Sequence, residues 1–320
     1  MGTNPLRDMK TLFDFVRVLR AEQPDVALFF TVKPVIYGSL AARLLGIPAI
    51  CTITGLGTAF MNKPWITRTV LTLYKAALRW PKKVFFQNNE DMTVFTSRGL
   101  VDIDRAARVP GSGVDLARFA PLPVRSNGEP VFLFCGRLLR DKGVGEFVEA
   151  ARLAKQQHPS ARFELLGPLD APNRSAIGRE SVQAWEAEGV VTYLGEADDV
   201  VPFMAAADCV VLASYYPEGV PRSLLEAASM ARPIITTDMP GCRSTVEDGV
   251  TGLLCEPRDV ASLARQMNRM IEMGPEQRTR MGRKGREKME REFDERIVVG
   301  QYLAAIDEML HACEASGAVS

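Results

Sequence analysis

The sequence has few histidines and no cysteine pair. Only His158 and His311 occur among 320 residues, so neither a histidine metal site nor a histidine-based catalytic triad is indicated. The six cysteines are scattered without a C-x-x-C spacing, and each lies in or beside an apolar run. This distribution predicts buried, reduced thiols rather than a disulfide framework.

An excess of charge and long apolar runs are also missing. The chain holds 39 Lys and Arg against 39 Asp and Glu, and a neutral balance gives no reason to expect a nucleic-acid partner. One uncharged stretch, 44–62, approaches transmembrane length, but it contains glycines, a proline and threonines. A buried strand followed by a glycine loop is therefore favoured over a membrane span.

Acidic residues are absent from 26–89, a segment of 64 residues that carries eight basic side chains. This segment has a charge of +8, and the rest of the chain, with 31 basic and 39 acidic residues, has a charge of −8. Such segregation predicts that the first half of the chain faces an anionic partner.

Short β-branched runs alternate with amphipathic stretches along most of the chain, which is typical of βαβ units and parallel sheets. In the first part the predicted strands are 25–30, 48–53 and 83–88, with helices near 7–22, 35–45, 64–79 and 90–98. In the second part the predicted strands are 131–136, 161–167, 190–195, 209–214, 233–238 and 252–257.

The fold class is therefore α/β, with two Rossmann-like doubly wound domains. We expect domain boundaries at 1–120 and 121–296 and a C-terminal helix at 297–320 that packs back toward the first domain. The Pro-rich stretch 115–130 is the expected linker. The first domain opens on a helix, so we expect it to lack a first βαβ segment.

Ligands of open α/β sheets bind beyond the carboxyl ends of the strands, which directs attention to the loop after 131–136. Gly136 allows the backbone to approach a ligand, while Arg137 and Lys142 supply positive charge just before a predicted helix start. The loop is a candidate phosphate clamp, although it is not a Walker A loop. The alternative is an ordinary solvated βα loop.

A second loop follows the predicted strand 209–214. Pro221 is suited to a helix start, which predicts unpaired N–H groups at Arg222, Ser223 and Leu224 and hence a second anion site.

Two glutamates flank this helix start, Glu218 before it and Glu226 within it. Carboxylates beside a diphosphate are repelled unless they accept hydrogen bonds from hydroxyl groups, and a sugar nucleotide has hydroxyls on both sides of its diphosphate. The alternative for Glu226 is a surface carboxylate, but its neighbours in the sequence are apolar, which favours a buried role.

These motifs together resemble the retaining glycosyltransferases of family 4, which have the GT-B fold. The match rests on the E-x7-E pattern from Glu218 to Glu226, on Gly136 and Arg137 with Lys142, and on the strand order around them. The resemblance implies a first domain that binds the acceptor and a second that binds a nucleotide sugar. It implies catalytic roles for Glu218, Arg137 and Lys142. The donor-binding residues that it implies are Gly136, Arg137, Lys142, Ala197, Glu218, Gly219, Val220, Pro221, Arg222, Ser223, Leu224 and Glu226.

Segments of the first part are similar to the subgroup that extends polyprenyl-diphosphate-linked glycans for bacterial capsules, lipopolysaccharide O-antigens or glycoproteins. These segments are TVKP (31–34), ITGLG (53–57) and PGSGVD (110–115). The similarity implies acceptor-side roles for Thr31, Lys33, Gly55 and Gly57. A polyprenyl diphosphate in an anionic membrane would also suit the basic segment 26–89.

The segment 61–84 combines aromatic, leucine and basic residues without acids, as an interfacial helix requires. The alternative is a helix packed into the core with a solvated basic face. With no signal peptide pattern visible, we expect a cytoplasmic protein held peripherally on the inner face of the membrane.

The expected reaction is transfer of a hexose or N-acetylhexosamine, with retention, from a nucleotide sugar of the UDP type to a lipid-linked saccharide. No metal or other cofactor is expected, because no D-x-D cluster follows a predicted strand. Two alternatives stay open: a nucleotide-sugar epimerase or phosphorylase of the same architecture, and a non-catalytic nucleotide-sugar-binding protein.

Overall fold

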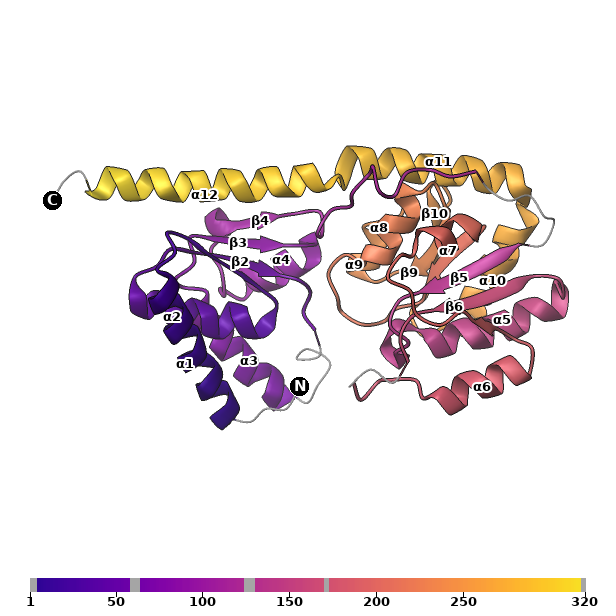
Figure 1. Cartoon of the computed structure of the whole chain (residues 1–320), viewed down its shortest axis with the longest axis horizontal. Helices are drawn as coiled ribbons and strands as arrows, with labels where there is room; N and C mark the ends of the chain where they lie inside the picture. The colour runs from indigo at the N-terminus through magenta and orange to yellow at the C-terminus, as the bar shows by residue number, and fades with distance from the viewer. Residues whose placement is uncertain (1–4, 58–63, 124–129, 170–172, 318–320) are drawn as a thin grey trace. The chain divides into compact units, whose positions relative to one another are not determined.

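The computed structural model describes residues 5–57, 64–123, 130–169 and 173–317 (Figure 1). It divides into two units. Unit 1 comprises Met1–Ser112, Pro217–Val220 and Arg296–Ser320, and unit 2 comprises Gly113–Tyr216 and Pro221–Glu295. Each unit is a parallel sheet with helices on both faces, so the expected α/β class is confirmed.

The division between the units differs from the expected boundary at residue 120. The backbone N–H of Val114 donates to the carbonyl of Phe293 at 2.8 Å, and the Ser229 hydroxyl donates to the carbonyl of Phe119 at 2.8 Å. These bonds tie the start of the expected linker to unit 2. Residues 124–129 of that linker lie outside the described residues.

Unit 1 contains a four-stranded sheet of order β1-β2-β3-β4, in which every neighbouring pair is parallel. The three-residue strand β4 is too short to give a periodic signal, and sequence reasoning missed it. The elements are α1 (Pro5–Glu22), β1 (Ala27–Phe30), a π-helix (Pro34–Gly38), α2 (Ser39–Leu45), β2 (Ala49–Ile53), α3 (Pro64–Ala77), β3 (Lys83–Phe86), α4 (Asn89–Ser97), a 3-10 turn (Ile103–Arg105), β4 (Ala106–Arg108) and α12 (Glu295–Gly317).

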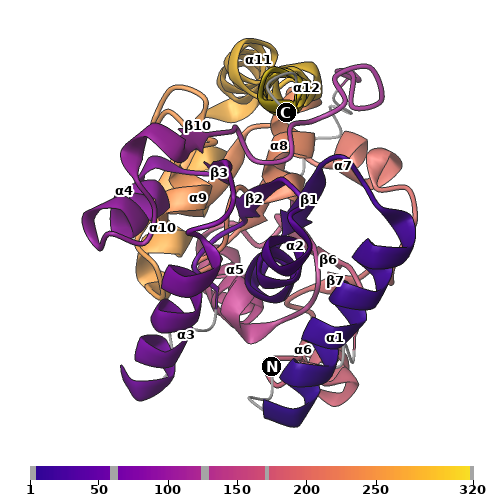
Figure 2. The ribbon, with the colours of Figure 1, turned by 90° about the vertical axis from the view of Figure 1, so that its left-hand side faces the viewer.

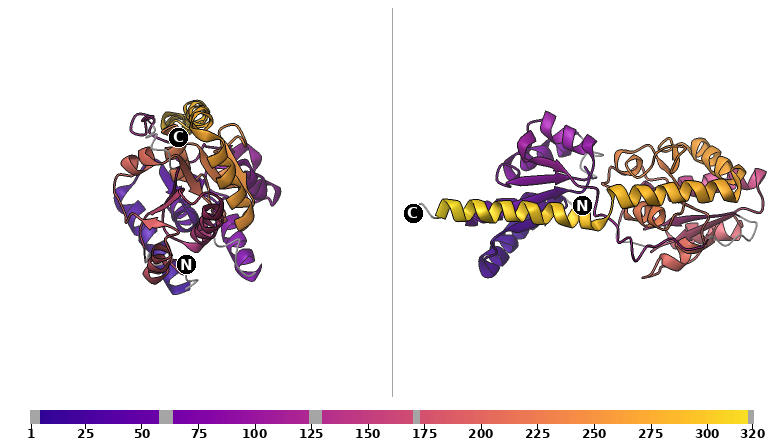
Figure 3. Two further views of the ribbon diagram at one scale, coloured as in Figure 1. Left: turned by 90° about the vertical axis from the view of Figure 1, so that its right-hand side faces the viewer. Right: turned by 90° about the horizontal axis from the view of Figure 1, so that it is seen from above.

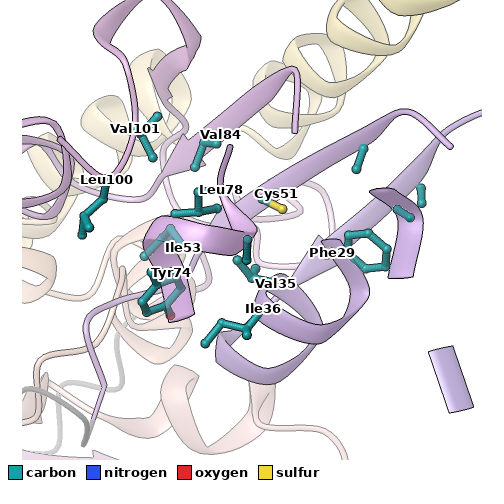
Figure 4. Packing of buried hydrophobic residues seen from close by; sticks show 14 of the residues in the cluster. Phe29, Val35, Ile36, Cys51, Ile53, Tyr74, Leu78, Val84, Leu100 and Val101 are labelled. Carbon is teal, nitrogen blue, oxygen red and sulfur yellow. The ribbon is translucent and has the colours of Figure 1, made fainter. Parts of the chain in front are cut away.

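Two apolar clusters cover the two faces of this sheet. The larger one receives side chains from α1 to α4, the helices that Figure 2 shows beside this sheet, and includes Phe29, Cys51 and Tyr74 (Figure 4). On the other face, Ala305 and Met309 of α12 pack against Ile50 and the rest of a smaller cluster. The helix α12 runs straight across this face (Figures 1 and 3), so the C-terminal segment completes the core of unit 1.

The described part of the segment 61–84 agrees with the second of its two interpretations, a helix packed into the core with a solvated basic face. Tyr74 and Leu78 are buried, and Leu71, Leu73 and Trp80 pack against the same cluster. The Trp80 indole N–H donates to the Ile47 carbonyl at 2.9 Å. An interfacial helix that inserts these side chains into lipid is therefore wrong, because they form the core. Residues 61–63 lie outside the described residues, as does the side chain of Trp65.

Unit 2 contains a six-stranded parallel sheet of order β7-β6-β5-β8-β9-β10. The helices α5 and α10 pack together on one face, and α8 and α11 pack together on the other. The elements are β5 (Val131–Cys135), a 3-10 turn (Arg140–Lys142), α5 (Val144–Gln157), β6 (Arg162–Leu166), α6 (Arg179–Ala187), β7 (Thr192–Tyr193), α7 (Val201–Ala206), β8 (Cys209–Leu212), α8 (Arg222–Ser229), β9 (Ile234–Thr237), α9 (Pro240–Arg243), β10 (Gly252–Cys255), α10 (Val260–Glu272) and α11 (Gly274–Glu292).

One buried arginine connects several segments of unit 2 by hydrogen bonds. Arg232 is 1% exposed, and its guanidinium donates to the carbonyls of Met204 at 3.1 Å, Ala205 at 2.9 Å and Leu122 at 2.8 Å. It ties the chain before β5 and the end of α7 to the start of β9. Burial lowers the pKa of Arg232, and the hydrogen bonds compensate part of the desolvation cost.

We expect Arg232→Met to destabilise unit 2 by about 3 kcal/mol, because it removes the charge-assisted hydrogen bonds that the buried guanidinium donates to the carbonyls of Met204, Ala205 and Leu122. The change in the urea midpoint of unfolding measures this loss. Arg152→Met is the matched control: Arg152 pairs with Glu149 and Glu188 on the surface, where ion pairs contribute little. Equal midpoints for the two variants would contradict the prediction.

Candidate functional site

The strand order of unit 2 defines where a ligand should bind. In chain order the six strands lie as 3-2-1-4-5-6 across the sheet, so the order reverses between β5 and β8. Chain connections leave this point toward opposite sides, which opens a crevice beyond the carboxyl ends of the two strands. The loops after β5 and β8 border that crevice.

The loop after β5 carries the predicted phosphate clamp. Gly136 has φ +150°, the side chain of Arg137 is exposed, and that of Lys142 is half-buried. The loop ends at Gly143, where φ is +80° and a Cβ atom would lie 2.1 Å from the carbonyl oxygen of Ala213. Only glycine fits, because the loop passes directly against the end of β8.

Hydrogen bonds join the loops after β5 and β8. The carbonyl of Asp141 accepts from the N–H of Tyr215 at 3.1 Å and from the hydroxyl of Ser214 at 3.4 Å. The Ser214 carbonyl in turn accepts a short hydrogen bond from the hydroxyl of Thr237, and the Arg258 guanidinium stacks on the Tyr215 ring at 4.3 Å. The border of the crevice is thus fixed by contacts that sequence reasoning missed.

The neighbouring strand ends are also close together. A Cβ atom at Gly167, after β6, would lie 1.9 Å from the Gly136 carbonyl oxygen, and the Gly167 N–H donates to the Gly195 carbonyl at 2.8 Å. Gly195 begins the bend after β7 with φ +83°, two residues before the half-buried Ala197. Ala197, one of the donor-binding residues that the resemblance implies, therefore follows a strand end at the same edge of the sheet.

The helix start after β8 differs in detail from the prediction. Pro221 is the N-cap residue of α8, with φ −69° and ψ 124°. The N–H of Leu224 donates to the Pro221 carbonyl at 3.2 Å, so the prediction that this N–H is unpaired is wrong. Arg222 and Ser223 are the remaining donors of the first turn.

Glu226 lies one turn into α8, and its side chain is 14% exposed. Burial raises the pKa of this carboxyl, and the positive charges of Arg222 and Arg118 partly oppose the shift. The Arg222 guanidinium lies 3.5 Å from the Glu226 carboxylate. The charge of Glu226 also contributes to the raised pKa of Cys135, about 12, whose main cause is burial.

The segment Pro217–Val220, which contains Glu218 and Gly219, belongs to unit 1. The N–H of Gly57 donates to the Pro217 carbonyl and the N–H of Gly219 donates to the Thr54 carbonyl, both at 2.9 Å. Gly55 has φ +110°, and a Cβ atom there would lie 2.5 Å from the carbonyl carbon of Glu218. The glycines predicted to lie on the acceptor side thus form the surface on which this segment packs.

A further residue at this place was missed. Gln87 directly follows β3 and is 9% exposed, and its side-chain oxygen accepts from the N–H of Val220 at 3.1 Å. The rule that ligands gather at the carboxyl ends of parallel strands could have drawn attention to Gln87. Nothing in the local sequence indicates its partner.

Thr31 and Lys33 follow β1. Thr31 is exposed and has φ +66°, a strained conformation for a β-branched residue and typical of functional positions. Lys33 forms an ion pair of 2.9 Å with Asp8 of α1. Burial, and secondarily the charge of Asp8, raise the pKa of Tyr37 to about 12. Lys33 is therefore ion-paired with Asp8, a feature that its sequence motif did not reveal.

The described residues contain no group of three or more His, Cys, Asp or Glu side chains that could hold a metal ion. Asp198 and Asp199 precede α7, and the Asp199 carboxylate accepts from the Val201 N–H at 3.2 Å, so these two carboxylates lie at a helix start. In the same described ranges, no helix is both long and apolar enough to cross a membrane.

Two families match the chain. Residues 122–288 match "Glycosyl transferases group 1", and residues 2–88 match "Glycosyl transferase 4-like". The first match covers the whole border of the crevice in unit 2, and the second includes the strands β1 to β3 of unit 1.

Two curated relatives align over most of the chain. One is N,N'-diacetylbacillosaminyl-diphospho-undecaprenol alpha-1,3-N-acetylgalactosaminyltransferase of Campylobacter jejuni, 27% identical, with 96% of this chain and 83% of the relative covered. The other is UDP-Gal:alpha-D-GlcNAc-diphosphoundecaprenol alpha-1,3-galactosyltransferase of Escherichia coli, 26% identical, with 83% of this chain and 71% of the relative covered.

Solved structures show the same fold. A glycosyltransferase of Rickettsia africae has a TM-score of 0.77 at 19% identity and covers 97% of this chain and 83% of its own. The Anabaena protein Alr3699/HepE, solved in complex with UDP-glucose, has a TM-score of 0.75 at 21% identity and covers 94% and 82%. The chain therefore belongs to the glycosyl transferases group 1 family and is a family-4 glycosyltransferase with the GT-B fold.

Proposed function

We propose that this glycosyltransferase moves a hexose or N-acetylhexosamine from a UDP-linked donor to a saccharide carried on a polyprenyl diphosphate, with retention at the anomeric carbon. The observation that carries the proposal is the reversal of strand order between β5 and β8: the loop after β5 carries Arg137 and Lys142, and the helix after β8 carries Glu226, whose side chain is largely buried. The names of the two curated relatives, which act on diphospho-undecaprenol-linked sugars, support the acceptor class.

The nucleotide is assigned to unit 2. Arg137 and Lys142 hold the diphosphate, together with the N–H groups of Arg222 and Ser223 at the start of α8, where the helix dipole favours negative charge. Glu226 accepts hydrogen bonds from the ribose hydroxyls. The HepE structure with UDP-glucose supports a uridine donor for this fold.

The chemical step is assigned mainly to electrostatic stabilisation. As the bond between the sugar and the diphosphate breaks, Arg137 and Lys142 stabilise the negative charge on the leaving diphosphate, a contribution that preorganised cations make without reorganisation. Glu218 contacts the donor sugar. These two cations supply the required charge, so the proposal includes no metal cofactor, and activity in the presence of EDTA tests that part.

The acceptor is assigned to unit 1, at the carboxyl end of β1, where the strained Thr31 and the ion-paired Lys33 lie. The acid-free segment 26–89 belongs to this unit, and Arg68, Lys75 and Arg79 on and after α3 are exposed. With Leu71, Leu73 and Tyr74 of α3 in the core, we propose that the protein associates peripherally with an anionic cytoplasmic membrane face through its basic side chains.

We expect Arg137→Ala and Lys142→Ala each to lower kcat/KM by about 10²–10³, the usual loss when a group that stabilises transition-state charge is removed. The measurement is transfer of labelled sugar from a panel of sugar nucleotides to a lipid-extractable product, whose anomeric configuration is read by NMR. Arg140→Ala, an exposed arginine of the same loop, is the control and should stay within about threefold of the parent chain.

The same assay separates the alternatives. Label that remains in a changed free sugar nucleotide would indicate an epimerase, and binding without turnover would indicate a non-catalytic protein. An inverted product would contradict retention, and equal activity of all three variants would contradict the assigned clamp.

We expect the affinity for the sugar nucleotide to weaken as the pH falls, beginning above the range in which an ordinary glutamate titrates. The reason is that the pKa of Glu226 is raised by burial, so the carboxylate that accepts ribose hydroxyls is protonated early on acidification. Arg222→Ala should move the midpoint to still higher pH, because Arg222 opposes the shift. Titration calorimetry from pH 5 to 8 measures both.

Glu226→Gln provides the control for this pH dependence. The variant should bind more weakly at neutral pH and lose the acid-dependent weakening, since no titrating group remains at that position. A pH profile that is unchanged in Glu226→Gln would assign the effect to another group.

We expect the chain to sediment with phosphatidylglycerol-containing vesicles at low salt, to lose that association in 0.5 M NaCl, and to ignore phosphatidylcholine vesicles. Replacing Arg68, Lys75 and Arg79 by Ser should weaken partitioning by about fivefold per charge, since each basic residue near an anionic surface contributes about 1 kcal/mol. The control replaces the exposed Arg280, Arg283 and Lys284 of α11. Equal losses in both triple variants would show that the effect is not specific to α3.

A further inference from the structure

Three hydrogen bonds join the segment Pro217–Val220 to the loops after β2 and β3, and one of the three uses a side chain. Two are backbone bonds, from Gly57 N–H to Pro217 and from Gly219 N–H to Thr54. The third runs from Val220 N–H to the side-chain oxygen of Gln87. Of these three hydrogen bonds, the one to Gln87 can therefore be removed by a substitution at the acceptor residue, because its acceptor is a side-chain atom.

Gln87 is itself rigidly placed. It follows Phe86, whose carbonyl accepts from the Val109 N–H at 2.9 Å. It precedes Asn88, whose side chain caps α4 by accepting from the Asp91 N–H at 2.7 Å and donating to the Asp91 carboxylate at 3.0 Å. A side chain anchored on both sides by a strand and a capped helix can position its partner precisely.

The fit to the segment is close. A Cβ atom on Gly219 would lie 1.7 Å from the Gln87 side-chain oxygen and 3.0 Å from the Thr54 carbonyl oxygen. The amide of Gln87 thus occupies the space that any side chain at residue 219 would need. This explains why glycine follows Glu218, although φ at Gly219 is not in the left-handed region.

We infer that Gln87 is a positioning residue for Glu218: through the N–H of Val220 it sets the backbone that carries the carboxylate assigned to the donor sugar. The inference rests on the proposed transfer reaction for its catalytic consequence and on the hydrogen-bond geometry for its structural part. Gln87 acts through the backbone and has no assigned contact with either substrate.

The test uses Gln87→Met, which keeps the length of the side chain but removes the strong acceptor, and Gln87→Glu, which retains an acceptor oxygen. We expect Gln87→Met to lower kcat by about 10- to 100-fold, the loss typical of a small misplacement of a catalytic group, with the donor KM within about threefold. Gln87→Glu should restore most of kcat. Gln183→Met, on the exposed side of α6, should be unchanged.

A double-mutant cycle with Glu218→Gln identifies the route of action. If Gln87 acts through Glu218, then Gln87→Met should cost less than about twofold in the Glu218→Gln background, because the group that it positions is already disabled. Losses that multiply would overturn the inference, as would an unchanged kcat in Gln87→Met itself.

Amide hydrogen exchange separates this inference from the proposed function. Exchange at Val220 should accelerate at least tenfold in Gln87→Met and return toward the parent rate in Gln87→Glu, whether or not transfer is detected. If the parent chain transfers no sugar but exchange behaves in this way, the proposed function fails and the positioning contact stands. If exchange at Val220 does not change, the positioning contact is overturned.

Discussion

The site in unit 2 depends on close backbone contact between loops at the carboxyl ends of neighbouring parallel strands. The loop after β5 passes so near the end of β8 that residue 143 has no room for a side chain, and residue 167 is under the same constraint against residue 136. Because the strand order reverses at β5 and β8, the loops that meet there border the crevice. This contact fixes the positions of the cationic side chains in the loop after β5 and of the helix start in the loop after β8.

Close backbone contact also organises unit 1, but there it involves a segment whose neighbours in the sequence belong to unit 2. Residues 217–220 leave unit 2 after β8, pack on the glycines that follow β2 and on Gln87 after β3, and return at Pro221. The E-x7-E pattern is therefore divided between two structural units: its first glutamate is held by unit 1, and its second lies in a helix of unit 2. The two glutamates of one continuous motif therefore lie in different environments: Glu218 is in a segment that packs on glycine loops, and Glu226 is on a buried face of a helix.

Charge is also divided between the units. The acid-free segment 26–89 lies wholly in unit 1, where Leu71, Leu73 and Tyr74 of α3 pack in the core and Arg68 and Lys75 of the same helix remain exposed. Peripheral proteins bind membranes by hydrophobic insertion and by electrostatic attraction. Here the buried side chains cannot insert into lipid, whereas the exposed basic side chains can still be attracted to an anionic surface. Lys33, by contrast, is paired with Asp8, so it adds less free charge than its motif implies.

Sequence patterns alone determined the α/β class, the main strands, and the loop with Arg137 and Lys142, because alternation, β-branched runs and turn glycines are local signals. They could not reveal that Lys33 pairs with Asp8, that Tyr74 of α3 is in the core, that Leu224 bonds back to Pro221, or that Gln87 holds Val220, 133 positions away along the chain. Those features depend on which strands become neighbours and how loops meet at their ends. Only the tertiary structure decides this, because the free energy of such contacts comes from burial and hydrogen bonding between groups that the sequence places far apart.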